Sequence, residues 1–278
     1  MHRATTVDEA VSLRVKYGAD AAVYAGGTEL LLAMKLGVAR WPHLIDVKPI
    51  AALRRVESTA SAIRIGATVT HWDLERDPIV QRLLPSLAAL ERNVANVRVR
   101  AAGTLVGNIA FAEPHADPPT LLNALGASVL LQGERGARTV AIADFVTGMY
   151  QTTLAPDEIV VGVEIPIPGA AVRASYVKFQ ILERPSVGVA IVGELRDGRF
   201  GSAPAVVVGA VDEMPRRVDT AALRGADARD EKTADALADA ARRSVEPVAD
   251  LAGSEEYKRH VVGVFARRAL DDLLAQAA

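Results

Sequence analysis

The spacing of apolar and polar residues divides the start of the chain into short helices and strands. Residues 6–9 read TVDE, a capping-box pattern in which the threonine oxygen accepts from the third helical amide, so a helix is expected to begin there. It would continue through Val11 and Val15 and end at Gly18, because glycine tolerates the left-handed conformation that ends many helices. The apolar run from Ala21 to Tyr24 then predicts a strand.

A glycine turn follows this predicted strand. Residues 25–29 read AGGTE, and the leucine-rich residues 30–36 after them predict a helix that ends at Gly37. A further strand is expected over residues 44–47. The first fifty residues therefore predict a compact β-α-β-like unit.

The next hundred residues predict short strands alternating with helices. Strands are expected at 63–67, 128–132 and 158–167, and helices after Thr70 and near 120–125. Proline suits a first helical turn, so one longer helix is predicted from Pro78 toward Val94. A second glycine segment, AAGTLVGNIA, occupies residues 101–110, and the run PIPG at 166–169 marks the predicted domain boundary.

The last hundred residues follow a different pattern. Three strand-like runs, 175–181, 188–195 and 203–211, predict an antiparallel meander with Asp197-Gly198 as a turn. From Thr220 the chain is alanine-rich with helical spacing, and a helix is expected from Glu255 to the end. The predicted fold class is α+β, with a domain over 1–169, subdivided into about 1–55 and 56–169, and a carboxy-terminal domain over 170–278.

Composition and charge narrow the classes of function. Half of the 278 residues are hydrophobic and 24% are charged, which excludes a disordered chain. Lys and Arg total 32 against 34 Asp and Glu, so no nucleic-acid partner and no anionic membrane surface is expected. Asp8 and Glu9 stand where a signal peptide needs an apolar core, and no uncharged stretch is long enough to cross a bilayer. A cytoplasmic protein without membrane insertion is predicted.

The absence of cysteine excludes several kinds of site. Disulfides, thiol catalysis, thiolate zinc sites and iron–sulfur clusters held by this chain alone all require that residue. Electron transfer by this chain therefore requires an organic cofactor. His71, beside the predicted cap at Thr70, has no second histidine at metal-binding spacing and is interpreted as structural. No metal ligand and no catalytic residue is predicted.

Two glycine segments about eighty residues apart are the candidate binding elements. Glycine lets a backbone approach a phosphate closely, and the start of a helix just after such a turn attracts negative charge. Neither segment matches the Rossmann glycine pattern or the lysine-bearing P-loop. Taken singly, each pattern is more often only a turn.

The two segments together resemble a known family. Residues 25–31, AGGTELL, are similar to the first flavin loop of the FAD-binding subunit of molybdenum hydroxylases, the group that contains carbon monoxide dehydrogenase and xanthine dehydrogenase. Residues 104–108 with Pro114, Ala116, Asp117 and Pro118 are similar to its second loop. The similarity continues through residues 121–127 and 157–166, and residues 176–179, YVKF, resemble the start of the family's carboxy-terminal domain.

The resemblance implies a cofactor, a fold and a set of contacts. The fold is a two-subdomain FAD-binding domain of the PCMH type followed by a small carboxy-terminal domain with an antiparallel sheet and helices. The pyrophosphate of FAD would be held by the amides of Ala25, Gly26, Gly27, Thr28, Glu29 and Leu30. The opposite wall would be formed by Thr104, Gly107 and Asn108. Asp117 would accept hydrogen bonds from cofactor hydroxyls, and Tyr176 and Lys178 would lie near the isoalloxazine or the phosphates.

The resemblance also implies an assembly. In this family a large molybdenum subunit oxidises the substrate, and a small subunit passes electrons through two iron–sulfur clusters. The flavoprotein subunit collects them on FAD for an external acceptor. Such a subunit is part of a hetero-oligomer, and a chain without cysteine depends on its partner for the clusters.

Two alternatives stay open at this point. One is a free-standing FAD-dependent oxidoreductase that turns over a small molecule without other subunits. The other is a flavin-free assembly scaffold, suggested by Val106, which stands where the family usually has glycine. A branched side chain restricts the backbone angles and would crowd a phosphate there. The scaffold is also suggested by residues 183–187, ERPSV, which depart from the acidic position that family members often have a few residues after the lysine of YVKF.

Overall fold

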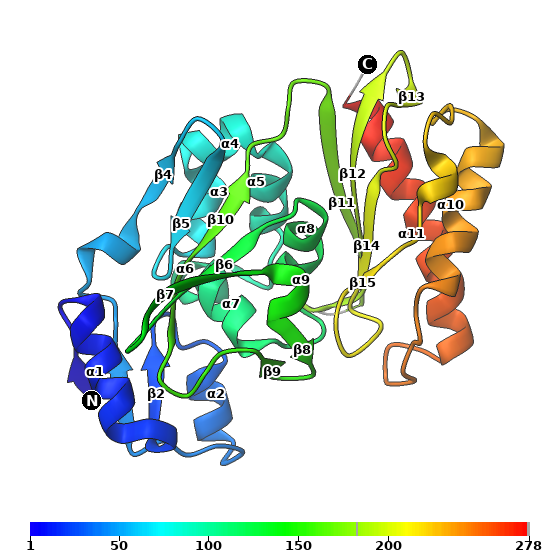
Figure 1. Ribbon diagram of the computed structural model, residues 1–278. Helices are drawn as coiled ribbons and strands as arrows, with labels where there is room; N and C mark the ends of the chain where they lie inside the picture. Colours follow the sequence, from blue (N-terminus) through cyan, green and yellow to red (C-terminus); the bar gives the residue numbers. More distant parts are fainter. Residues whose placement is uncertain (182, 277–278) are drawn as a thin grey trace. The chain divides into compact units, whose positions relative to one another are not determined.

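The computed structural model describes residues 1–181 and 183–276, which form two compact units (Figure 1). The first unit consists of Met1–Glu113 and Ala127–Ile167. The second consists of residues 114–126 and the chain from Pro168 onward. Both units combine helices with β-sheet, which confirms the α+β class.

The first unit begins with a three-stranded parallel sheet in the order β1 (His2–Arg3), β3 (His43–Asp46), β2 (Ala21–Tyr24). Helix α1 (Val7–Tyr17) is capped by the Thr6 hydroxyl, which accepts from the Glu9 amide, and ends at Gly18 with φ +51°. Helix α2 (Leu30–Lys35) connects β2 with β3. The predicted β-α-β-like unit is confirmed, and the sequence analysis missed β1.

A five-stranded sheet forms the rest of the first unit's framework. Its order is β4 (Val56–Ser58), β5 (Ala62–Gly66), β10 (Ile159–Pro166), β6 (Ser128–Gly133), β7 (Gly136–Ala141), and every neighbouring pair is antiparallel. After β7 follow α9 (Ile142–Phe145) and the short pair β8 (Val146–Gly148) and β9 (Gln151–Thr152). The predicted strands at 63–67, 128–132 and 158–167 correspond to β5, β6 and β10.

Along the chain, five short helices follow β5 and precede residues 114–126. They are α3 (His71–Arg76), α4 (Pro78–Leu83), α5 (Pro85–Arg92), α6 (Val97–Ala102) and α7 (Leu105–Phe111). The prediction of one helix from Pro78 toward Val94 is wrong, because the chain breaks at Leu84 with φ −137° and ψ 60°. Pro85 has no amide hydrogen and disfavours helical backbone at the preceding residue, so a new helix begins there.

The second unit contains an antiparallel sheet in the order β11 (Val172–Gln180), β12 (Pro185–Arg196), β14 (Ala205–Gly209), β15 (Arg216–Arg217), with β13 (Arg199–Phe200) paired to β12. Asp197 and Gly198, both at positive φ, form the predicted turn, which joins β12 to β13. The meander is confirmed. The helices of this unit are α8 (Pro118–Ala124), α10 (Glu231–Arg243) and α11 (Glu255–Ala275).

The two faces of the second unit's sheet pack differently. Val187, Val189 and Ile191 alternate along β12 and join the apolar core that α10 and α11 complete. Helix α8 contacts β12 and β14, where a Cβ on Gly209 would collide with the Thr120 side chain. In Figure 1, α8 lies on one side of these strands, and α10 and α11 lie on the other. Within residues 1–181 and 183–276, no helix has the length and apolar character of a membrane span.

Candidate functional site

The first glycine loop lies between β2 and α2 and has no room for side chains at its two glycines. A Cβ on Gly26 would collide with the carbonyl oxygen of Ala102. Gly27 has φ +74°, and a Cβ there would run into the ring of Tyr24. Only glycine satisfies both conditions, so the sequence AGG at 25–27 follows from the local geometry.

This loop also presents backbone donors. No backbone carbonyl of the described chain accepts from the amides of Gly26, Gly27 or Thr28, whereas Leu31 already donates to the Gly27 carbonyl at 2.9 Å. Three consecutive amides are therefore available to a ligand oxygen. This arrangement fits the predicted pyrophosphate contact of residues 25–30, and the contact itself stays a prediction.

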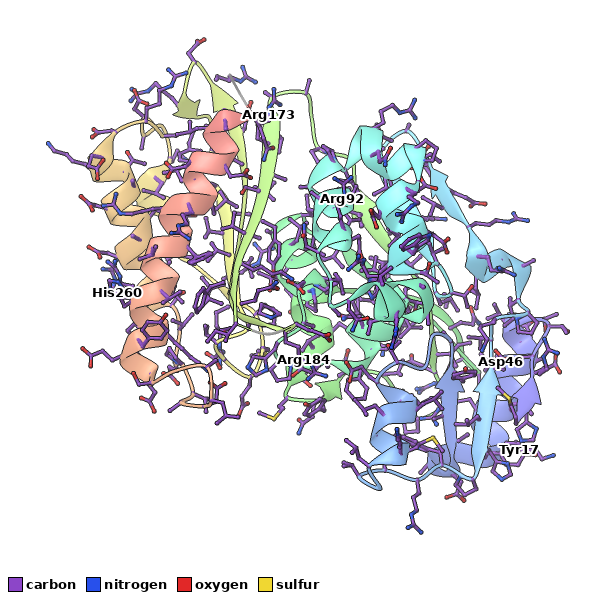
Figure 2. All side chains as sticks on the ribbon, turned by 180° about the vertical axis from the view of Figure 1, so that it is seen from behind. Tyr17, Asp46, Arg92, Arg173, Arg184 and His260 are labelled. Carbon is purple, nitrogen blue, oxygen red and sulfur yellow. The ribbon has the colours of Figure 1, made fainter. Side chains whose placement is uncertain are left out.

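Lys48 is a residue near this loop that the sequence analysis missed. Its Nζ lies 3.3 Å from the Ala25 carbonyl oxygen and 2.8 Å from Asp46 Oδ1, and 3.5 Å from the centre of the Tyr24 ring. Figure 2 labels Asp46, the last residue of β3. Neighbouring parallel strands end at the same edge of a sheet. The position of Lys48 soon after β3 therefore indicates, from the sequence alone, that it lies near the loop after β2.

The second glycine segment is largely helical. Thr104 caps α7, its hydroxyl accepting from the Gly107 amide at 3.0 Å and its carbonyl from the Asn108 amide at 3.0 Å. The amides of Gly107 and Asn108 are therefore already used within α7 and are not available to an anion. The side chain of Asn108 differs from its amide, because its Oδ1 is buried and has no hydrogen-bond partner among the described residues.

Val106 occupies ordinary helical backbone in the first turn of α7, with a buried side chain. Valine is tolerated in a helix, with one preferred rotamer. The expectation that a valine at this position conflicts with the backbone angles of the loop is wrong, since the position requires no glycine conformation.

The two segments meet inside the first unit. Gly26 packs against Ala102 and Gly103, leaving no space for a Cβ between them. On Gly103, a Cβ would lie 3.3 Å from the Thr28 hydroxyl. Residues 26–28 thus lie against residues 102–103, which directly precede the predicted contact residues 104–108, although about eighty residues separate the two segments.

Three further predicted residues form a cluster inside the second unit. The Tyr176 hydroxyl donates to Asp117 Oδ1 at 2.8 Å, and Lys178 Nζ lies 3.0 Å from the same oxygen. The side chains of Asp117 and Lys178 are 5% and 11% exposed. This charge pair is therefore largely removed from water, unlike most ion pairs on protein surfaces.

Strand alternation explains the cluster. Tyr176 and Lys178 are two residues apart on β11 and share one face, while Val177 and Phe179 turn to the apolar core on the other. Gly188 lies opposite Lys178 on β12, and a Cβ there would be 2.7 Å from the Tyr176 hydroxyl. Asp117 precedes α8, whose far end is held by Arg217 through two hydrogen bonds to Asn123.

The environment of Tyr176 keeps its hydroxyl protonated. Burial raises the pKa of Tyr176 well above its usual range, and the negative charge and hydrogen bond of Asp117 raise it further. The phenol is thus a hydrogen-bond donor, and Asp117 is an acceptor that two neighbours already occupy. In the described part of the chain no group of three His, Asp or Glu side chains is arranged to hold a metal ion.

Sequence comparison relates both parts of the chain to known families. Residues 1–168 match the family described as FAD binding domain in molybdopterin dehydrogenase, and residues 182–273 match the CO dehydrogenase flavoprotein C-terminal domain. The chain is 33% identical to the carbon monoxide dehydrogenase medium chain of Hydrogenophaga pseudoflava, over 100% of this chain and 97% of that one. It is 32% identical to the nicotine 6-hydroxylase medium subunit of Paenarthrobacter nicotinovorans, over 90% and 89%.

Solved structures agree with this relationship. A carbon monoxide dehydrogenase structure from Hydrogenophaga pseudoflava matches with a TM-score of 0.95 at 35% identity, over 99% of this chain and 96% of that one. Quinoline 2-oxidoreductase from Pseudomonas putida 86 matches with a TM-score of 0.94 at 28% identity, over the same shares. The chain therefore belongs to the FAD-binding medium subunits of the molybdenum hydroxylases, and its cofactor is FAD.

Proposed function

We propose that this chain collects electrons from the iron–sulfur clusters of a small partner subunit and passes them to an external acceptor, in a complex with a large molybdenum subunit. FAD supplies the chemistry, because a flavin accepts electrons singly and releases them in pairs. The chain's own contribution is to bind and orient that cofactor. A single observation carries this proposal: the close packing of Gly26 on Ala102 beside three amides that no described carbonyl uses.

The predicted contacts of the first unit have proposed roles. The amides of the first loop hold the pyrophosphate, together with the Thr28 hydroxyl, and the buried Asn108 Oδ1 accepts a hydrogen bond from the cofactor. Thr104 and Gly107 support this wall by starting α7. The contact residues proposed on this basis in the first unit are Ala25, Gly26, Gly27, Thr28, Glu29, Leu30, Thr104, Gly107 and Asn108. For Asp117, Tyr176 and Lys178 of the second unit, the contact rests on the family resemblance alone.

The free-standing oxidoreductase is the alternative that an experiment should separate. The chain is tagged at its amino terminus and purified from cells that express it at its natural level. Copurifying chains that carry molybdenum, iron and acid-labile sulfide support the proposal. Oxidation of a small-molecule substrate by the tagged chain alone, with FAD and no other subunit, would overturn it.

The flavin-free scaffold is not retained. The chain belongs to an FAD-binding family, and Val106, one of the two grounds for this alternative, lies in regular helix. The cytoplasmic location, the hetero-oligomeric state and the identity of the partners stay predictions.

A further inference from the structure

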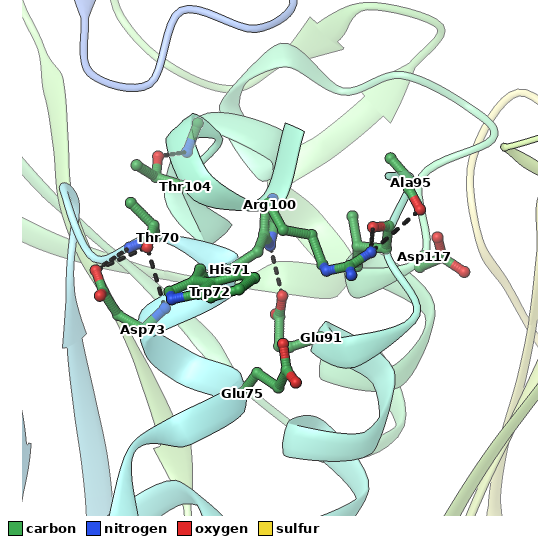
Figure 3. Close-up of polar contacts among 12 residues, drawn as sticks. Thr70, His71, Trp72, Asp73, Glu75, Glu91, Ala95, Arg100, Thr104 and Asp117 are labelled. Carbon is green, nitrogen blue, oxygen red and sulfur yellow. Dashed lines mark hydrogen bonds and ion pairs between the residues drawn. The ribbon is translucent and has the colours of Figure 1, made fainter. Parts of the chain in front are cut away.

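A buried ionisable pair lies in the first unit, outside the predicted cofactor contacts. His71 is the first residue of α3, and its Nδ1 lies 2.5 Å from Glu91 Oε2 on α5 (Figure 3). The two side chains are 3% and 0% exposed. No step of the proposed function uses either residue.

The His71 imidazole lies next to Gly103, where the two glycine segments meet. The His71 amide donates to the Gly103 carbonyl at 3.0 Å, and Thr70 forms an isolated β-bridge with Thr104. A Cβ on Gly103 would lie 3.2 Å from His71 Cδ2 and 3.3 Å from the Thr28 hydroxyl. The glycine is thus enclosed by the ring of His71 and the first loop.

The His71–Glu91 pair is surrounded by buried polar atoms that lack hydrogen-bond partners among the described residues. Glu91 Oε1 and Arg100 Nε are both buried without a hydrogen-bond partner in the described chain, while Arg100 Nη1 donates to the Val94 and Ala95 carbonyls. A buried pair with an unsatisfied oxygen contributes less to stability than two apolar side chains of similar volume would. Leu87 and Leu90, on the same helix as Glu91, are buried apolar side chains. Stability alone therefore does not account for the pair.

We infer that His71, held in place by Glu91, is a positioning residue for FAD. The Nδ1 hydrogen bond fixes the ring plane, the ring supports Gly103, and Gly103 sets the spacing between Thr28 and the start of α7. Binding sites depend on such supporting groups because the contact residues must be held within fractions of an ångström. This inference rests on the proposed assignment of the two segments to the cofactor.

The test separates FAD affinity from folding. The double variant His71→Phe/Glu91→Leu replaces the pair by apolar side chains, so its melting temperature without FAD is expected to equal or exceed that of the natural chain. Its dissociation constant for FAD, measured by quenching of flavin fluorescence on the FAD-free full chain, is expected to rise at least about tenfold, as for other supporting residues of a binding site. A purely structural role predicts instead that the dissociation constant rises only when the melting temperature falls.

Two more variants complete the experiment. Glu91→Gln keeps an acceptor for the imidazole and is expected to retain FAD affinity, which makes it the conservative rescue. Leu87→Met changes another buried side chain of α5 while keeping its volume, and is expected to bind FAD like the natural chain. His71→Asn, which keeps a donor toward Glu91 but has no ring, tests the inference if the double variant does not fold, and the same loss of affinity is expected.

The outcomes distinguish the inference from the loop assignment. Natural FAD affinity in both the double variant and His71→Asn would overturn the positioning role. If Gly26→Val also kept its FAD, the assignment of the first loop would have failed as well. Loss of FAD in Gly26→Val with full affinity in the His71 variants would overturn the inference alone.

Discussion

The two units offer opposite kinds of predicted binding element. In the first unit, Gly26 and Gly27 matter because they lack side chains, which lets backbone approach backbone and leaves amides available. In the second unit, Asp117, Tyr176 and Lys178 matter because of the charges and hydroxyl that they carry. A site of the first kind fails when an atom is added, and a site of the second kind fails when one is removed.

The largest expected effect is at the first loop. Gly26→Val places a branched side chain where the Ala102 carbonyl lies, so the loop must move away from Gly103. We expect the purified variant to be colourless and to take up no added FAD. The absorption spectrum after gel filtration measures this, with Gly169→Val as the matched control, since a Cβ on Gly169 would meet only Val172 at 4.0 Å. A yellow Gly26→Val protein would contradict the loop's role.

Removing the carboxylate of the second unit's cluster should have the next largest effect. Asp117→Ala leaves the largely buried Lys178 ammonium without this partner, and we expect a loss of about 3 kcal/mol in the free energy of unfolding. Urea denaturation measures it. Asp271→Ala, an exposed position on α11, is the control and should change stability little. Equal stability of the two variants would show that the pair contributes nothing to the fold.

A smaller effect is expected at the hydroxyl of the same cluster. Tyr176→Phe removes one hydrogen bond to Asp117, which should cost about 1 kcal/mol. Because the folded state raises the pKa of Tyr176, the hydroxyl stabilises the fold below about pH 10 and loses this contribution as the pH rises further. The variant should show a flatter alkaline limb in thermal melts. Tyr257→Phe, an exposed tyrosine of the same unit, should leave that limb unchanged.

The smallest expected effect is a change in the acid stability of the first unit that the second unit does not share. The side-chain hydrogen bond from Arg138 lowers the pKa of Glu158 in the first unit. Its contribution to stability is therefore full above the ordinary value of about 4.3 and is lost as the pH falls through the lower folded pKa. Arg138→Gln should reduce this acid dependence.

Hydrogen exchange resolved along the chain can locate that effect. In the second unit, burial raises the pKa of Asp212 but hydrogen bonds from Arg216 outweigh it, so the net pKa is lowered there too. Arg138→Gln should change acid protection in β6, β7 and β10 and leave β14 and β15 as they are. Equal changes in both sets of strands would contradict an effect confined to one unit.

Local chemistry made much of the fold predictable. Thr6 and Thr70 begin helices because a hydroxyl at that position satisfies a free amide, and Gly18 ends one because it adopts positive φ. The alternation of Tyr176 and Lys178 with Val177 and Phe179 is visible in the sequence as a strand with two different faces. The longer helix predicted from Pro78 failed because the restriction that Pro85 imposes on Leu84 was overlooked.

The sequence by itself determined where the two glycine segments lie, where the helices capped by Thr6 and Thr70 begin, and that electron transfer by this chain requires an organic cofactor. Only the tertiary structure decided which distant side chains meet. Residues 114–126 join the second unit because Tyr176, Lys178 and Arg217 hold both ends of α8. His71 finds Glu91 through the packing of α3 on α5. Such pairings depend on the burial of whole helix and strand faces, and short-range patterns do not encode their register.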